Sequence, residues 1–155
     1  MANLFRITQL ILPWISIVFY PRRSLIRYLP VAILAAMLVG GMCTLAAPYK
    51  WWRVEGGLRT KIFNDFSFIM GPFFIGTLWI FYFTFAQFKR YFITNLIFDG
   101  FFAFIFSAVL EKLNIFKLVT FKRTYIFFSF LSFSFIIYGF ELLLNKRGQI
   151  LSLKK

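Results

Sequence analysis

The chain has 155 residues, of which 61% are hydrophobic and 25 are phenylalanine, and its formal net charge is +13. A soluble domain of this size cannot bury so much apolar surface in its own core, so lipid must surround most of it. Histidine is absent and cysteine occurs once, which excludes an internal disulfide, zinc held by Cys and His, histidine-ligated haem and the usual nucleophile systems. We therefore expect no enzyme activity, no catalytic residue, no metal and no cofactor.

The apolar segments predict an all-α, polytopic transmembrane helical bundle. Backbone polar groups inside a bilayer must be satisfied within the chain, and the apolar runs are longer than the strands of a β-barrel. A helix of about 20 residues crosses a hydrocarbon core of about 30 Å. Four spans of this kind are predicted within a single domain that covers residues 1–155. They are residues 28–49, 66–86, 91–110 and 124–144.

The N-terminal apolar run, residues 7–20, has two interpretations. Its length and the presence of Pro13 favour an interfacial or re-entrant segment. A start at Asn3, with Arg6 reaching back to the headgroups, would instead make it a short fifth span. No small-residue cleavage site follows it, so a cleaved signal peptide is not expected.

The first predicted span, residues 28–49, has Pro30 in its first turn and Pro48 at its exit, both positions where proline is tolerated. Small side chains recur along it at every fourth position. This ridge consists of Ala32, Ala36, Gly40 and Thr44. Because small residues let transmembrane helices approach closely, the ridge predicts a helix-packing surface.

The second predicted span, residues 66–86, contains Gly71 and Pro72. Pro72 cannot donate a hydrogen bond to the preceding turn, so the helix axis should bend there. Asn64 and Asp65 come just before the span. We interpret them as its N-terminal cap, where a carboxylate favours the helix dipole.

The connections between spans are short and basic. Residues 50–65 and 111–123 are too few to form a core of their own, so any site must lie in the bundle or at its mouth. The first connection opens with an interface anchor made of Lys50, Trp51, Trp52 and Arg53. Tryptophan prefers headgroup depth, the two cations meet lipid phosphates, and Gly56 and Gly57 turn the chain. A site that recognises a lipid headgroup is the alternative interpretation of the same residues.

Asp99 lies near the middle of the third span, residues 91–110, although every Lys and Arg lies outside the four predicted spans. An ionised carboxylate in hydrocarbon is costly. Asp99 must therefore face the bundle or a wet cavity, take up a proton, bind a cation, or meet a charge on another subunit.

Steps of four residues along this span give a polar and small ridge. It consists of Asn95, Asp99, Ala103, Ser107 and Glu111. Asn95 is expected to donate to Asp99, and the ridge is expected to pack against the small-residue ridge of residues 28–49. In the structural interpretation Asp99 fixes the register of the bundle through hydrogen bonds. In the functional one, Asp99 and Asn95 form a proton-coupling or ion-coupling site.

The fourth span, residues 124–144, presents Ser134, Tyr138 and Glu141 on one face. Tyr138 and Glu141 are further candidates for the coupling site. Glu141 is the weaker indication of function, because it lies near the helix end, can reach the headgroups and has Lys146 close by.

The basic residues form five groups between the apolar runs. This distribution is typical of membrane flanks that attract anionic lipid headgroups, and it does not favour a nucleic-acid partner. Opposite loops carry nearly equal numbers of Lys and Arg, so charge says little about orientation. The basic C-terminal segment favours a cytoplasmic C-terminus.

Four segments, PRRSLIRYLP, KWWR, NDFSFIMGPFFIGTLWIF and NLIFDGFFAF, resemble a group of small multi-pass integral-membrane proteins of unknown function from endospore-forming Firmicutes. The resemblance covers most of the chain and implies a location in the bacterial cytoplasmic membrane. It implies no activity, cofactor or site residue.

Two classes of function remain open. The first, which the sequence favours, is an accessory or assembly protein that packs against a membrane-protein partner. The second is a small ion-coupled or proton-coupled transporter. A transporter of this size would be a homo-oligomer, because four helices enclose little space.

Overall fold

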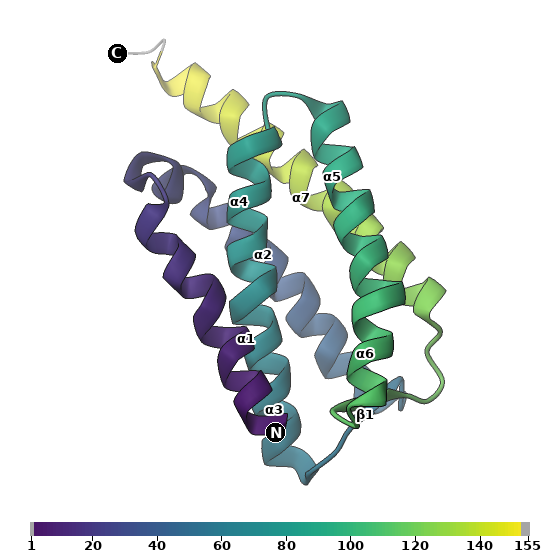
Figure 1. The fold of residues 1–155 in the computed structure, drawn as a ribbon. Coiled ribbons are helices and arrows are strands. Elements are labelled where there is room, and N and C mark those ends of the chain that lie inside the picture. The colour runs from purple at the N-terminus through teal and green to yellow at the C-terminus, as the bar shows by residue number, and fades with distance from the viewer. Residues whose placement is uncertain (1, 153–155) are drawn as a thin grey trace.

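The computed structural model describes the backbone of residues 2–152 and the side chains of residues 3–146. Helices run back and forth between the two ends of one bundle (Figure 1), which confirms the predicted all-α fold. The first helix is α1 (Ala2–Ser16), extended by the short η1 (Ile17–Phe19), and the second is α2 (Arg22–Ala46). The third is built from α3 (Gly57–Phe68), η2 (Ile69–Phe73) and α4 (Phe74–Thr84). The fourth is built from α5 (Phe88–Gly100), η3 (Phe101–Phe106) and α6 (Ser107–Lys112), and the fifth is α7 (Arg123–Ser152).

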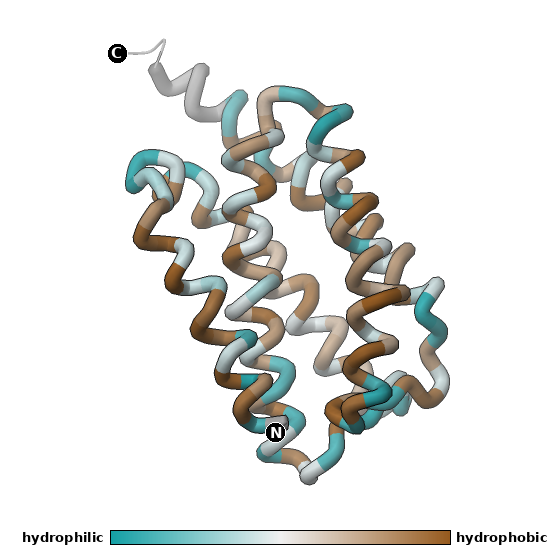
Figure 2. The backbone as a smooth tube through the Cα atoms, viewed as in Figure 1, coloured by the Kyte–Doolittle hydropathy of each residue, from teal (hydrophilic) through white to brown (hydrophobic). Residues whose placement is uncertain are grey.

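Four helices of the described chain are long and apolar enough to cross a membrane, so this is a multi-pass membrane protein. They are Arg22–Ala46, Gly57–Thr84, Phe88–Lys112 and Arg123–Lys146. Figure 2 shows hydrophilic segments gathered mainly at the two ends of the bundle. The helices are longer than the predicted apolar spans because helical backbone continues into the basic flanks. Pro30 therefore lies inside α2 and not in its first turn.

The N-terminal segment is a shorter apolar helix, Asn3–Phe19, and it packs against α3 and η2. Arg6 does not reach outward as the sequence suggested. It is 2% exposed, and its guanidinium donates to Asn64 Oδ1 on α3 at 3.2 Å and to Asn3 Oδ1 at 2.8 Å. A buried guanidinium needs such acceptors, and Asn64 supplies one from the neighbouring helix. Asn64 and Arg6 thus join α1 to α3.

The buried face of α2 is lined by small and β-branched side chains and packs most extensively against α4. Ala32 and Ala36 share a buried cluster with Leu78 of α4, whereas Gly40 is half-buried and Thr44 is exposed. The sequence predicted that this ridge packs closely against the helix that carries Asp99, and that prediction is wrong. That helix packs mainly on α4 and α7. The helical repeat identified the small face of α2 but not its partner.

Each of the two long central helices contains a π-helical turn. The first, η2, contains both Gly71 and Pro72, the residues where the sequence predicted a bend of the helix axis. Gly71 is buried where α1 crosses, and a Cβ placed on it would collide with the carbonyl oxygen of Gln9. Trp14 also donates its indole N–H to the carbonyl of Met70 at 2.9 Å. The proline-distorted turn therefore serves as the docking point of α1.

The two long connections pair with each other at one end of the bundle. Strands β1 (Trp52–Val54) and β2 (Phe116–Leu118) form an antiparallel two-stranded sheet. The turn that follows β1 places Gly56 at φ 104° and Gly57 at φ 84°, which confirms their predicted role as turn residues. The sequence did not reveal the sheet, because two short strands from distant connections leave no local pattern.

Candidate functional site

Asp99, on α5, is buried in the interior of the bundle. Its relative exposure is 9%, and its Oδ2 atom is fully buried and has no hydrogen-bond partner in the described chain. No Lys or Arg among the described side chains forms an ion pair with it. Burying a carboxyl oxygen without a partner costs free energy, because the oxygen loses its hydrogen bonds to water and forms none within the protein.

A cavity of about 30 Å³ adjoins this carboxyl group. Its lining combines aromatic and aliphatic walls with a few polar side chains. The polar part of the lining consists of Thr77 from α4, Tyr91, Asn95 and Asp99 from α5, and Ser134 from α7. A cavity larger than about 10 to 15 Å³ has room for a water molecule if polar groups surround it. The space beside Asp99 meets both conditions.

The polar neighbours of Asp99 bond elsewhere. Asn95 Nδ2 donates to the Tyr91 carbonyl at 2.9 Å, so the predicted bond from Asn95 to Asp99 is not formed. The Tyr91 hydroxyl donates to the Ser134 carbonyl at 2.8 Å, which joins α5 to α7, and Thr77 Oγ1 donates to its own helix. Backbone carbonyls four residues back compete for such donors, as they often do in helices. The Asp99 oxygens are consequently left to the cavity.

The predicted ridge of this helix is its inward face. Asp99 and Ser107 are buried, Ala103 has no exposed surface, and Asn95 and Glu111 are partly covered. The helix that carries the ridge packs mainly against α7 and α4. Between Asp99 and Ser107 the helix widens into η3, a π-helical turn. Such turns occur frequently at functional sites, and the uniformly apolar sequence FFAFIF gave no signal for this one.

Comparison with known proteins adds nothing to this geometry. No protein family, curated protein or solved structure matches the chain.

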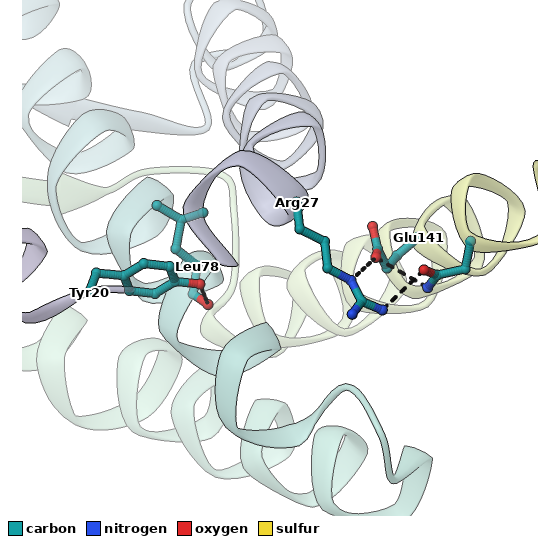
Figure 3. Close-up of polar contacts among 5 residues, drawn as sticks. Tyr20, Arg27, Leu78 and Glu141 are labelled. Atoms are coloured by element: carbon teal, nitrogen blue, oxygen red, sulfur yellow. Dashed lines mark hydrogen bonds and ion pairs between the residues drawn. The ribbon is translucent and has the colours of Figure 1, made fainter. Parts of the chain in front are cut away.

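Glu141 on α7 is the second buried acidic group, with a relative exposure of 1%. Figure 3 shows Arg27 of α2 directed toward it, with Nε 3.7 Å from Glu141 Oε1. Asn145 completes the cluster: it donates to Glu141 Oε1 at 3.3 Å and accepts from Arg27 at 3.0 Å. The expectation that Glu141 would reach the headgroups beside Lys146 was wrong, because α7 continues beyond it and α2 covers it.

Tyr138, the remaining candidate of this face, lies between Asp99 and Glu141 along the bundle. Its ring centroid is 4.8 Å from that of Tyr91 and 5.0 Å from that of Phe88. Its hydroxyl forms no hydrogen bond with the described residues. The structure therefore places Tyr138 among packing aromatic rings, outside the cavity of Asp99.

A second cavity, of about 60 Å³, lies under the two-stranded sheet and is lined by Trp52, Cys43 and Asp65 among other residues. Asp65 pairs with Lys61 on the same helix at 2.5 Å, and Lys61 also donates to the Cys43 carbonyl. The interpretation of Asn64 and Asp65 as a helix cap was wrong. The helix begins at Gly57, so both residues lie inside it.

The predicted interface anchor is split by the strand register. Trp52 lines the cavity below the sheet, whereas Arg53 is exposed. Trp51 stacks on Phe121 at 4.6 Å between ring centroids, and its carbonyl accepts the backbone N–H groups of Val119 and Phe121. The anchor is therefore part of an ordered aromatic assembly and not a single exposed loop.

Proposed function

We propose that this chain is a multi-pass protein of the bacterial cytoplasmic membrane in which Asp99 takes up and releases a proton inside the bundle. The observation that supports this proposal is the state of the Asp99 carboxyl group. Its Oδ2 atom is fully buried and has no hydrogen-bond partner among the described residues, and Asp99 lines a cavity. A carboxyl group placed at such depth in a membrane protein is typical of proton relays and coupling sites.

A proton suits the site better than a metal cation. Among the described residues that line the cavity, Asp99 carries the only carboxyl group. Alkaline-earth cations prefer six or more oxygen ligands, and one carboxylate in about 30 Å³ cannot supply them. A proton needs one oxygen, and the cavity has room for one water beside that oxygen.

A transported solute would not fit inside the helical bundle of a single chain. The two internal cavities hold about 30 and 60 Å³, which is much smaller than the sites of several hundred Å³ that bind small molecules. We therefore propose a homo-oligomer as the transporting unit, with Asp99 as the coupling residue in each copy.

The test compares Asp99→Asn with Asp65→Asn in liposomes. Asp65→Asn is the matched control because its carboxylate is paired with Lys61 at the end of the bundle. Proton flux should be present in the wild type and in Asp65→Asn, and absent in Asp99→Asn that retains its helical circular dichroism. Infrared difference spectra across a pH step should contain a protonated carboxyl band that Asp99→Asn removes. A wild type with neither flux nor this band would overturn the proposal.

An accessory or assembly role is the second candidate, and an apolar groove on the outer surface favours it. The groove has a volume of about 560 Å³ and lies between α1 and α3, with Ile11, Trp14 and Phe66 in its walls. We propose a transmembrane helix of a partner protein as its occupant, because the groove is open and every side chain that lines it is apolar.

Filling the groove tests this second role. Ile11→Trp should shift the chain from a larger complex to its own size when native membranes are extracted in mild detergent. Ile33→Trp is the control, because Ile33 on α2 is similarly exposed, 47% against 51%, and lies outside the groove. Equal migration of both variants and the wild type would exclude the groove as a partner site.

A further inference from the structure

The register of the two-stranded sheet places two cations side by side. Arg53 on β1 is the direct partner of Lys117 on β2. Directly opposed residues in an antiparallel pair have Cβ atoms about 4.5 to 5.5 Å apart and share one face. The two charges come from connections that are distant in the sequence, so only the tertiary fold brings them together.

The side chains on either side of this pair point the other way. Successive residues of a strand alternate between faces. Trp52 and Phe116 line the cavity beneath the sheet, and Val54 is buried. Arg53 and Lys117 are both exposed on the outer face, away from the helices.

The described chain places no carboxylate within ion-pair distance of these two cations, although the charge of Lys117 acts on Glu111 at longer range. Neither Arg53 nor Lys117 takes part in an ion pair there. Glu111, which lies close to β2, is already bound: Oε2 accepts from Arg123 at 2.5 Å and Oε1 accepts the Leu118 backbone N–H at 2.9 Å. Glu55 follows β1, is exposed and forms no ion pair among these residues.

Like charges directly opposite each other weaken a strand pair, and an isolated pair of short strands is only marginally stable. Here the sheet is held from outside the pair. Glu111 fixes Leu118, and Thr120 Oγ1 donates to the carbonyls of Tyr49 and Lys50 at 3.2 and 3.0 Å. The fold thus holds two cations in place although they repel each other. An anion bound between them would attract both and offset this repulsion.

We propose that Arg53 and Lys117 form a binding site for the phosphate of an anionic phospholipid. The guanidinium of Arg53 can bind two phosphate oxygens at once, and Lys117 adds a second positive charge on the same side. A lipid is the source because stacked aromatic rings, Tyr49 on Trp51 and Trp51 on Phe121, adjoin the sheet at the end of the bundle. Tryptophan and tyrosine gather at the headgroup level of membranes.

The test measures the retention of anionic lipid. The wild type, Arg53→Gln, Lys117→Gln and Arg59→Gln are reconstituted in nanodiscs of phosphatidylglycerol and phosphatidylcholine, extracted in mild detergent and analysed by native mass spectrometry. A basic residue that contacts the phosphate of a bound lipid contributes about fivefold to the affinity for that lipid. Arg53→Gln and Lys117→Gln should each weaken phosphatidylglycerol retention by about this factor. Arg59→Gln, which changes an exposed cation outside the sheet, should retain the lipid like the wild type.

Two further arms distinguish the sources of phosphate and the state of the fold. Inorganic phosphate added in detergent should leave the wild-type melting temperature unchanged, whereas phosphatidylglycerol should raise it more than phosphatidylcholine does. If inorganic phosphate raises the melting temperature and phosphatidylglycerol does not, the ligand of the site is free phosphate and the lipid proposal is overturned. Equal lipid retention in all four proteins, each with native circular dichroism, would overturn the site.

Discussion

Arg27 on α2 and Glu141 on α7 form a cross-helix ion pair in which the two partners have different surroundings: Arg27 has half of its side chain exposed, whereas Glu141 is fully buried. Loss of the arginine would leave a buried carboxylate with one amide donor. Loss of the carboxylate would leave an arginine that can still reach water. The two substitutions should therefore have unequal effects.

We predict that Arg27→Gln lowers the free energy of unfolding by about 1 to 3 kcal/mol, the usual cost of leaving a buried polar group without its partner. Glu141→Gln should cost less, because a neutral amide is cheaper to bury than a charge. Thermal unfolding in detergent measures both. A larger loss for Glu141→Gln than for Arg27→Gln would contradict the prediction.

Gly71 marks the closest approach of α1 to the bundle. A methyl group there would collide with the Gln9 backbone, which cannot move without shifting α1. Gly71→Ala should therefore lower stability by about 1 to 3 kcal/mol and loosen α1. Gly76→Ala, on the same long helix, has open space around its Cβ and should be neutral or slightly stabilising. Thermal unfolding and limited proteolysis near α1 should separate the two variants; similar curves would show that the contact does not hold α1.

Tyr91 and Tyr138, whose rings lie 4.8 Å apart between centroids, offer a matched pair. Tyr91→Phe removes the hydrogen bond to the Ser134 carbonyl and should cost about 1 kcal/mol. Tyr138→Phe removes a hydroxyl that bonds to none of the described residues and should change stability by less than about 0.5 kcal/mol. Denaturation monitored by circular dichroism compares them. Equal losses would mean that the Tyr138 hydroxyl has a partner of its own.

Glu111 connects the two-stranded sheet to the helix above it. Glu111→Gln should weaken its bonds to Arg123 and to the Leu118 N–H, at a cost of about 1 to 3 kcal/mol. Hydrogen exchange at the Leu118 amide should become faster. Glu55→Gln, which alters an exposed carboxylate without a partner among the described residues, is the control. Unchanged exchange at Leu118 in Glu111→Gln would indicate that the sheet is held by its aromatic contacts alone.

The direction of α1 leads to a prediction about the termini. Helix α1 begins at the end of the bundle that holds the sheet, and α7 runs toward the other end (Figure 1). We expect α1 to cross the membrane as a short fifth span, which places the two termini on opposite sides. Protease digestion of epitope tags at each terminus, in sealed vesicles of both orientations, tests this. Loss of both tags from the same side would mean that α1 does not cross.

The inward face of the helix that carries Asp99 could be predicted from the sequence. Polar and small residues at every fourth position can be buried together only if that face turns away from lipid, and Asp99, Ala103 and Ser107 are indeed buried. The hydrogen bonds of the face could not be predicted. Asn95 had two acceptors within reach, Asp99 and the Tyr91 carbonyl, and only side-chain packing selects between them.

The apolar runs by themselves determined that the chain is a membrane-spanning helical bundle, because a backbone in lipid must form its hydrogen bonds within each segment. Tertiary structure alone decided which helices touch. Glu141 has its partner on α2, and Arg53 faces Lys117 across two strands whose sequences carry no trace of pairing. The physical reason is that any apolar helix face is equally stable against lipid. Side-chain shape and the few polar groups therefore determine which helices pack together.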